Sequence, residues 1–204
     1  IVVNPNNPDG RIIAKDALLS LADRLRRRGG LRLVDEAFMD VGPEGASLGD
    51  QVECGNIVVL RSFGKFYGLA GLRLSFAIAA PNIAARIAAA LGPWPVSSAA
   101  LAVGTEALED AAWREAARKA LAEAAGRLDA LLARAGLSMI GGTSLFRLVR
   151  ASEAESLFQS LGQAGIMVRR FAEHPIWLRF GLPGGENEWQ RLERALASFA
   201  TSQT

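Results

Sequence analysis

The chain has 204 residues, half of them hydrophobic, and its 23 basic and 21 acidic side chains leave a net charge of +2. The length and the hydrophobic content are enough for the packed core of one large domain or one and a half, and they argue against disorder. The small net charge argues against a nucleic-acid-binding surface. No apolar run reaches the ~18 residues that a membrane-spanning helix needs. One cysteine, Cys54, and one histidine are too few for a disulfide framework or a conventional metal site, so we expect a cytoplasmic enzyme that binds no metal.

The first residues of the chain predict the end of a buried strand. Ile1-Val2-Val3 are β-prone, and the turn-forming run from Asn4 to Gly10 follows directly. A domain seldom starts on its central strand. We therefore expect this chain to be the C-terminal part of a longer protein.

The next segment alternates between helical and strand patterns. Residues 15–28 carry apolar side chains at the spacing of an amphipathic helix, and apolar runs predict strands at 31–34, 57–60 and 73–79. This rhythm predicts an α/β fold with a mostly parallel sheet and covering helices.

The pattern changes after residue 81. Residues 82–135 are rich in Ala and Leu and predict helices, interrupted by Gly92-Pro93-Trp94-Pro95. A smaller α+β unit is expected to follow, with strands near 145–149, 166–169 and 177–181 and helices near 153–162 and 186–199. We therefore expect part of a large domain at 1–104, a long connecting helix at 105–135 and a small α+β domain at 136–204.

Five polar side chains follow the predicted strands of the first part of the chain. The opening strand leads to Asn7, the second to Asp35, and the third to Ser62 and Lys65, with Arg73 further along. Open α/β sheets bind ligands at the carboxyl ends of their strands, so these side chains are expected to line one rim. Pyridoxal phosphate needs such a set: an amine for its aldehyde, a carboxylate for its ring nitrogen, an amide for its phenolic oxygen, and hydroxyl and guanidinium donors for its phosphate.

The same residues lie in motifs that resemble fold-type I pyridoxal-phosphate enzymes, in particular the branch of histidinol-phosphate aminotransferase. The motifs are Asn-Asn-Pro-Asp-Gly at 6–10, Val-Asp-Glu-Ala-Phe at 34–38, Ser-Phe-Gly-Lys at 62–65 and Gly-Leu-Ala-Gly-Leu-Arg at 68–73. The resemblance covers essentially the whole chain. It implies the C-terminal part of a transferase-like large domain plus a small α+β domain, pyridoxal phosphate as cofactor, and a homodimer in the complete protein.

Three further stretches are more similar to the threonine-phosphate decarboxylases of cobalamin biosynthesis, namely Leu91–Trp94, Gly141–Arg147 and Trp177–Pro183. This resemblance implies a lyase that converts threonine phosphate, a small phosphorylated amino acid, to aminopropanol phosphate. Transamination of the histidinol-phosphate type is the alternative, since the same residues serve both reactions. The outcome depends on which bond at the substrate Cα stands perpendicular to the cofactor ring.

The resemblance also implies a role for each polar residue of the rim. Lys65 is the catalytic residue and forms the Schiff base with the cofactor, while Asp35 pairs with the pyridinium nitrogen. Asn7 bonds the phenolic oxygen, and Ser62 and Arg73 hold the cofactor phosphate. Without the family context, each of these side chains has an ordinary structural reading, such as a solvated lysine or a turn former.

In the small domain, the resemblance implies that Arg179 grips the carboxylate of the substrate in a bidentate manner. Arg179 alternates with apolar neighbours on a predicted strand, which would also suit a solvent-facing residue. The arginines that bind the substrate phosphate cannot be identified from the pattern, and the candidates by charge are Arg147, Arg169 and Arg170.

Two departures from the family pattern bear on activity. Phe38 stands where many aminotransferases have a tyrosine that bonds the phenolic oxygen of the cofactor. The glycine-rich phosphate turn and the aromatic residue that stacks on the cofactor ring would lie N-terminal to Asn4. The resemblance therefore leaves open whether this chain binds the cofactor by itself.

Two other readings compete with a pyridoxal-phosphate enzyme. Ser62 and Lys65 match the S-x-x-K motif of serine acyl-enzymes, but the partner motifs Ser-Asp-Asn and Lys-Thr-Gly do not occur in the sequence. The second alternative is a non-catalytic fragment that only packs or self-associates. Trapping of added pyridoxal phosphate on Lys65 distinguishes this alternative from a functional site.

Overall fold

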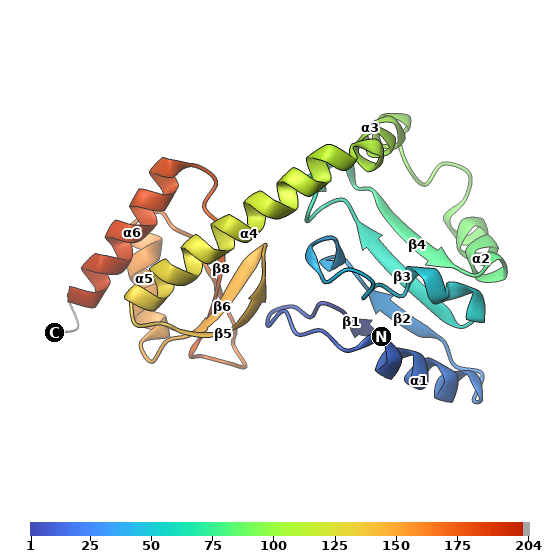
Figure 1. Ribbon diagram of the computed structural model, residues 1–204, viewed down its shortest axis with the longest axis horizontal. Coiled ribbons are helices and arrows are strands. Elements are labelled where there is room, and N and C mark those ends of the chain that lie inside the picture. Colours follow the sequence, from blue (N-terminus) through green and yellow to red (C-terminus); the bar gives the residue numbers. More distant parts are fainter. Residues whose placement is uncertain (202–204) are drawn as a thin grey trace. The chain divides into compact units, whose positions relative to one another are not determined.

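The computed structural model describes residues 1–201, which form two compact units (Figure 1). The N-terminal unit comprises Ile1–Glu115, and the C-terminal unit begins at Ala116. Each unit contains its own four-stranded sheet, flanked by helices. The α/β class expected from the sequence is confirmed.

The sheet of the N-terminal unit is mostly parallel. Strands β1 (Val2–Val3), β2 (Arg32–Asp35) and β3 (Ile57–Ser62) run parallel, and β4 (Ser75–Ala79) is antiparallel to β3, in the order β1-β2-β3-β4. The strand expected from residue 73 begins later because Arg73 has a left-handed backbone conformation, with φ 54°, at the end of the short helix η3 (Ala70–Leu72).

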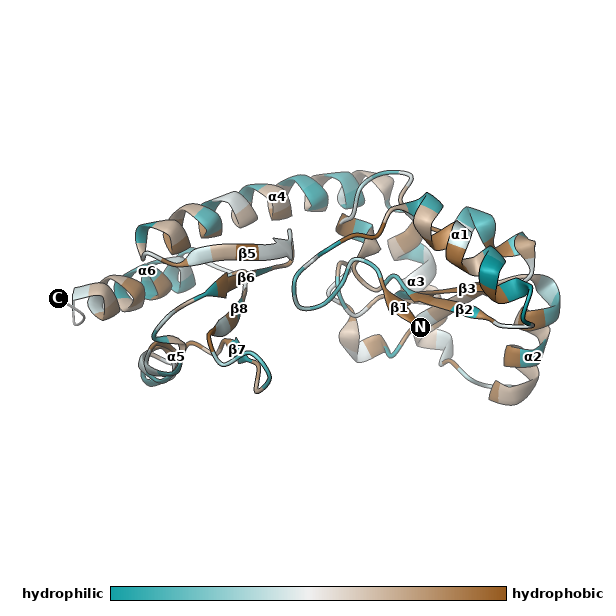
Figure 2. Cartoon of the chain, turned by 90° about the horizontal axis from the view of Figure 1, so that it is seen from below, coloured by the Kyte–Doolittle hydropathy of each residue, from teal (hydrophilic) through white to brown (hydrophobic). Residues whose placement is uncertain are grey.

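Helix α1 (Lys15–Arg26) contributes to the core of this unit. Its Leu18 and Ala22 are buried, and the helix ends where Gly30 N donates to Leu25 O at 2.8 Å. Figure 2 shows α1 as a mixture of polar and apolar residues, whereas β2 has two apolar residues between charged ends and β3 begins with four apolar residues. The core cluster consists of Leu18, Ala22, Val34, Leu48, Val52, Ile57 and Val59. Two short helices, η1 (Met39–Val41) and η2 (Gly49–Cys54), lie in the connection between β2 and β3.

Three helices follow β4, namely α2 (Pro81–Leu91), α3 (Ser98–Glu109) and α4 (Ala111–Arg134). The single helix expected over 105–135 is thus divided at Asp110, which leaves the helical conformation with ψ 79°. The Asp110 carboxylate accepts a hydrogen bond from Trp113 N at 2.8 Å and so caps the start of α4. Ser97 caps α3 in the same manner through Ala100 N.

The sheet of the C-terminal unit is antiparallel. It contains β5 (Ser138–Thr143), β6 (Phe146–Arg150), β8 (Trp177–Gly181) and β7 (Arg169–Arg170), in the order β5-β6-β8-β7. Strand β5 was not expected, because Gly141 and Gly142 interrupt the β-prone pattern. The structure uses them in an irregular pairing: Gly142 has φ 150°, and an added Cβ would lie 2.3 Å from Phe146 O.

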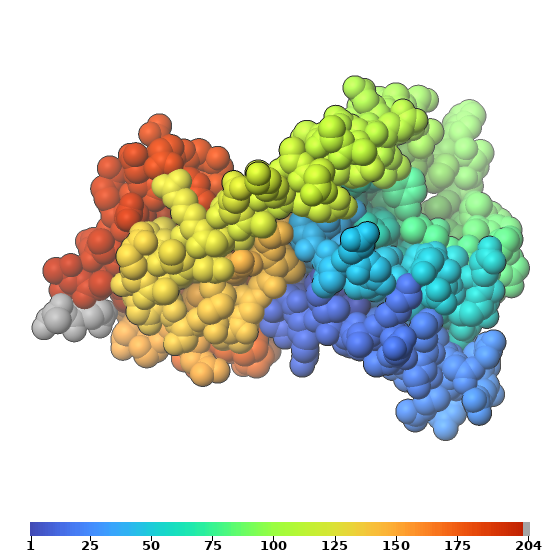
Figure 3. Space-filling model, viewed as in Figure 1, coloured from blue at the N-terminus to red at the C-terminus, as the bar shows by residue number. Residues whose placement is uncertain are grey.

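Helices α4, α5 (Ala154–Gln163) and α6 (Glu186–Thr201) supply the apolar cover of the C-terminal unit. Its core includes Leu128, Leu132, Leu157, Phe180 and Trp189. In Figure 3 the yellow C-terminal half of α4 lies against the red α6, where the exposed pairs Arg127–Glu186 and Arg134–Glu193 form. No helix in the described part of the chain is long and apolar enough to cross a membrane.

Candidate active site

The carboxyl ends of three neighbouring strands meet at one edge of the N-terminal sheet. Asp35 ends β2 and is level with Val3 of β1 and Leu60 of β3. The backbone is bonded on both sides of this point: Asn4 N donates to Asp35 O at 2.8 Å, and Glu36 N donates to Leu60 O at 2.9 Å. The structure therefore brings the segments that carry Asn7, Asp35 and Ser62 to the same edge.

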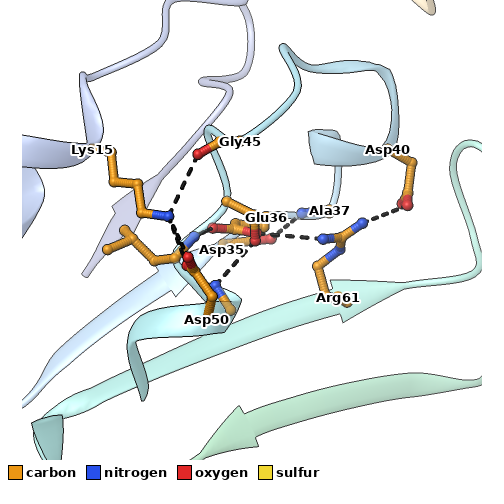
Figure 4. Close-up of polar contacts among 11 residues, drawn as sticks. Lys15, Asp35, Glu36, Ala37, Asp40, Gly45, Asp50 and Arg61 are labelled. Atoms are coloured by element: carbon orange, nitrogen blue, oxygen red, sulfur yellow. Dashed lines mark hydrogen bonds and ion pairs between the residues drawn. The ribbon is translucent and has the colours of Figure 1, made fainter. Parts of the chain in front are cut away.

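Asp35 is held in a defined orientation. Its carboxylate is half-buried, and Oδ1 accepts a hydrogen bond from Ala37 N at 3.0 Å (Figure 4). A carboxylate that accepts a backbone N–H two residues ahead is confined to one rotamer. This bond fixes the direction in which the carboxylate can face a ligand.

The loop after β3 carries the Ser62–Lys65 motif. Ser62 is the last residue of the strand, and its Oγ accepts a hydrogen bond from Gly64 N at 3.1 Å. The loop folds back on itself because Leu69 N donates to Phe63 O and Gly68 N donates to Lys65 O. Lys65 is exposed, and its Nζ lies 5.7 Å from the centre of the Phe38 ring. The amine of the β3 loop thus lies beside the segment that follows β2.

Arg73 ends the same loop in an unusual conformation. Among residues 1–201 it is the one non-glycine residue with a positive φ. Its side chain is exposed, and NH1 donates to Ala70 O at 3.3 Å. Non-glycine residues in the left-handed region cost free energy and occur often at ligand-binding sites.

Asn7 lies in a turn that is closed by its neighbours. Gly10 N donates to Asn6 O, and Asn6 Nδ2 donates to Asp9 Oδ1 at 2.7 Å. The side chain of Asn7 itself is exposed. The turn is anchored by Asn4, a fully buried residue whose amide bonds both backbone groups of Ile13.

A buried ionic network, not anticipated from the sequence, lies next to Asp35 (Figure 4). Glu36 is 0% exposed, accepts hydrogen bonds from Ser47 Oγ and Leu48 N, and lies 3.5 Å from Arg61. Arg61 also pairs with Asp40. The available signal was a charged residue inside or directly after an otherwise apolar strand, which implies a buried partner.

An apolar cavity of about 360 Å³ lies in the same unit. It is lined by Asp40, Arg61, Ser62, Phe63, Tyr67, Phe76, Ile78 and Leu108. Its aromatic wall continues into a stack, in which Tyr67 lies between Phe63 and Trp113 at centroid distances of 4.5 and 5.8 Å. Of the residues predicted for the site, only Ser62 lines this cavity.

Arg179 lies in the C-terminal unit, on β8. It is half-buried above the ring of Phe146, with 5.2 Å from the guanidinium carbon to the ring centre. Arg169 of β7 is its cross-strand partner. Burial lowers the pKa of the Arg179 guanidinium, and the positive charge of Arg169 lowers this pKa further. Two like charges directly opposite each other repel, and a bound anion would reduce this repulsion.

The other two arginines that were candidates by charge are engaged with carboxylates. Arg147 forms a bidentate pair with Asp129, at 2.6 and 3.1 Å. Arg170 pairs with Glu155 and lies over the ring of Phe158. Of the three arginines that were candidates for the substrate phosphate, Arg169 is the one paired in register with Arg179. The residues predicted for the site therefore lie partly in the N-terminal unit and partly in the C-terminal unit.

Comparison with known proteins identifies the relatives of this chain. The sequence pattern of the family "Aminotransferase class I and II" matches residues 1–199. The chain is 48% identical over 197 residues to a threonine-phosphate decarboxylase from Sinorhizobium sp. This match covers 97% of this chain and 59% of that protein. It is 44% identical to the threonine-phosphate decarboxylase of Pseudomonas aeruginosa, over 98% of this chain and 60% of that protein. The chain thus spans about 60% of the length of these two curated relatives.

Among solved structures, the fold is similar to that of histidinol-phosphate aminotransferase from Clostridium acetobutylicum. The TM-score is 0.89 at 23% sequence identity, and the match covers 98% of this chain and 64% of the other. At this identity the likeness concerns the fold alone.

Proposed function

The chain belongs to the aminotransferase class I and II family, and from this premise we propose that it is part of a pyridoxal-phosphate enzyme that decarboxylates threonine phosphate to aminopropanol phosphate. The observation that carries the proposal is the sequence identity of 48% and 44% to two threonine-phosphate decarboxylases, over 97% and 98% of this chain. Within this proposal, the activity belongs to cobalamin biosynthesis. The polar groups of the N-terminal unit support the choice of cofactor.

The donor set at the edge of the N-terminal sheet fits pyridoxal phosphate by its chemistry. It offers one amine at Lys65, one oriented carboxylate at Asp35 and a hydroxyl at Ser62, and these three groups belong to adjacent strands or to their loops. The amide of Asn7 and the guanidinium of Arg73 complete the set needed for the phenolic oxygen and the phosphate.

When bound, pyridoxal phosphate acts as an electron sink for the bond that breaks at the substrate Cα. Within the proposal, the negative charge of the Asp35 carboxylate would keep a proton on the ring nitrogen. The hydrogen bond from Ala37 N orients this carboxylate. Lys65 would hold the cofactor through its amine; in the alternative reaction, transamination, it would also be the base that removes the proton from Cα. Phe38 lies beneath the amine and offers no hydroxyl to the phenolic oxygen.

The C-terminal unit supplies substrate contacts in this proposal. Arg179 binds the carboxylate of the substrate, and its neighbour Arg169 binds the substrate phosphate. The choice of Arg169 is supported by the cross-strand pairing with Arg179 and by the carboxylate partners of Arg147 and Arg170. An arginine pair suits these groups because each guanidinium can form two parallel hydrogen bonds with an oxyanion.

The wider organisation of the protein is also part of the proposal. We assign residues 1–104 to the C-terminal part of a large cofactor domain, 105–135 to a connecting region whose long helix is α4 (Ala111–Arg134), and 136–204 to a small domain, of which 202–204 lie outside the described residues. The complete protein is proposed to be a cytoplasmic homodimer. Sedimentation of the complete protein tests the assembly directly.

The decisive experiment uses the complete polypeptide that contains this chain. Threonine phosphate is supplied with pyridoxal phosphate, and carbon dioxide is measured with and without a 2-oxo acid. We expect carbon dioxide to be released without the 2-oxo acid acceptor. No release, together with acceptor-dependent formation of a new amino acid from histidinol phosphate, would instead establish an aminotransferase.

Borohydride trapping tests the cofactor separately from the reaction. The sequence has three lysines, Lys15, Lys65 and Lys119, so peptide mapping distinguishes them. We expect the reduced pyridoxyl group on Lys65. Its absence from that peptide would reject the cofactor site and favour a non-catalytic role.

A further inference from the structure

Asp35 and Glu36 are adjacent in sequence but face opposite sides of the sheet. Side chains alternate along an extended strand, and the pairing of β2 with β3 continues beyond Asp35 through the bond from Glu36 N to Leu60 O. Burial agrees with this alternation, since Asp35 is half-buried whereas Glu36 is 0% exposed. The Glu36 side chain therefore lies on the face opposite that of the proposed cofactor carboxylate.

The Glu36 carboxylate connects three segments of the N-terminal unit. Oε1 accepts from Leu48 N at 2.8 Å, and Oε2 accepts from Ser47 Oγ at 2.6 Å (Figure 4). The same Oε2 lies 3.5 Å from NH1 of Arg61 on β3. These partners satisfy the buried charge and tie the end of β2 to the 47–48 loop and to the next strand.

Arg61 extends this connection toward the lysine loop. Its other terminal nitrogen pairs with Asp40, so one guanidinium bridges two carboxylates of the segment after β2. Arg61 directly precedes Ser62, at the point where β3 ends and the loop with Lys65 begins. Since both ends of the bridge are buried or half-buried, it can fix the position of the strand end.

Stability alone gives little reason for such a bridge. Replacement of a buried ion pair by apolar side chains is often neutral or stabilising, whereas a directional pair specifies geometry. The bridge joins the residue after Asp35 to the residue before Ser62. It therefore acts where the separation between the Asp35 carboxylate and the Lys65 amine is determined.

We propose that Glu36 and Arg61 form a positioning pair that sets the distance between Asp35 and the Ser62–Lys65 loop from the opposite face of the sheet. This inference rests on the proposed function, because it assigns the pair to the geometry of the cofactor groups. Neither side chain touches the cofactor in this assignment. The pair acts through the backbone of the two strand ends.

The test compares Glu36→Gln with the wild-type complete polypeptide and with Glu44→Gln, a control at an exposed glutamate of the same connection. Glutamine keeps the shape of the side chain but removes its charge. The measurements are the dissociation constant of pyridoxal phosphate, the pH midpoint of the absorbance of the bound cofactor, and the thermal midpoint. We expect Glu36→Gln to weaken cofactor binding about tenfold and to shift the pH midpoint, with no change in Glu44→Gln.

Arg61→Lys is the second variant, and it decides the question if Glu36→Gln does not fold. Lysine keeps the charge but cannot bridge two carboxylates as a planar fork. A changed pH midpoint and weaker cofactor binding in this variant support the positioning role. A lower thermal midpoint with unchanged cofactor affinity and pH midpoint shows a purely structural role and overturns the proposal.

Failure of this inference can be told from failure of the proposed function. If the wild type is trapped on Lys65 and both variants match it in affinity and pH midpoint, the positioning role is wrong while the cofactor site stands. If the wild type yields no adduct on Lys65, the proposed function fails and this inference fails with it.

Discussion

The two units of the chain differ in how far their apolar side chains are buried. In the C-terminal unit, α4, α5 and α6 form one core with the sheet, and Phe180 is 1% exposed. In the N-terminal unit, β4 leaves Phe76 and Ile78 each 37% exposed, and Leu108 of α3 is 47% exposed. Helix α2 has no buried residue.

The units also differ in the chemistry that they carry. The amine and the oriented carboxylate belong to the N-terminal unit, whereas the C-terminal unit contributes paired arginines. The contrast teaches that the amine and the oriented carboxylate belong to the unit whose β4 side chains are partly exposed, whereas the paired arginines belong to the unit in which three helices and the sheet share one core. We therefore expect core substitutions in the C-terminal unit to affect stability, and polar substitutions in the N-terminal unit to affect activity.

The largest expected effect tests the chemistry of the N-terminal unit. Lys65→Ala in the complete polypeptide is predicted to abolish turnover, because no other group at this site can hold the cofactor aldehyde. Lys119→Ala, at an exposed lysine of α4, is the control and is expected to retain full activity. A near-normal rate in Lys65→Ala would refute the mechanism.

The next effect tests the packing contrast. Phe180→Ala is predicted to lower the free energy of unfolding by about 3–5 kcal/mol, because it leaves a cavity in a core. Phe76→Ala should cost less than about 1 kcal/mol, since its ring is partly exposed. Urea denaturation measures both. Equal losses would show that the β4 face is as well covered as the core of the C-terminal unit.

A third substitution tests the chemistry of the C-terminal unit. Arg179→Lys is predicted to lower kcat/KM about 100-fold, because lysine cannot form a bidentate pair with a carboxylate. Cofactor trapping and the thermal midpoint should not change. Arg194→Lys, at an exposed position of α6, is the control. If Arg179→Lys keeps the wild-type kcat/KM, Arg179 has no part in substrate binding.

The smallest effect concerns pH and the surface of the N-terminal unit. The hydrogen bond from Lys15 is the main cause that lowers the pKa of Asp50 below its usual 3.8 (Figure 4). A lowered folded-state pKa means that the stabilisation is complete above the unfolded-state value and is lost as pH falls through the folded-state value. Asp50→Asn should therefore lower the thermal midpoint slightly at neutral pH and not at about pH 2.

The control for the pH experiment is Glu44→Gln, which removes an exposed carboxylate outside the helices. If the difference between wild type and Asp50→Asn is the same at both pH values, the ion pair does not stabilise the fold.

Much of the N-terminal unit could be predicted because its strands are short apolar runs that end in polar residues. The runs near 31–34 and 57–60 correspond to β2 and β3, which pair in parallel as expected. The direction of β4 could not be predicted, because it depends on how the loop through Arg73 folds back. Strand β5 was missed since paired glycines are unfavourable in a strand until a partner strand accommodates them.

The candidate site shows the same division. The motifs identified Lys65 and Asp35 as groups suited to one cofactor, and their roles stay predictions. The motifs did not indicate that Glu36 is buried, or that Asn4 anchors the turn that carries Asn7. Both facts depend on partners that are distant in the sequence.

The sequence by itself determined the family and the order of the reactive groups, because the identity of an amine or a carboxylate does not depend on how the chain folds. Only the tertiary structure decided which charged side chains engage one another. Glu36 forms an ion pair with Arg61, and Asp129 forms one with Arg147. Arg169 and Arg179 are cross-strand neighbours in register. These pairings follow from strand register and helix packing, which bring together residues far apart in the chain and which local sequence does not encode.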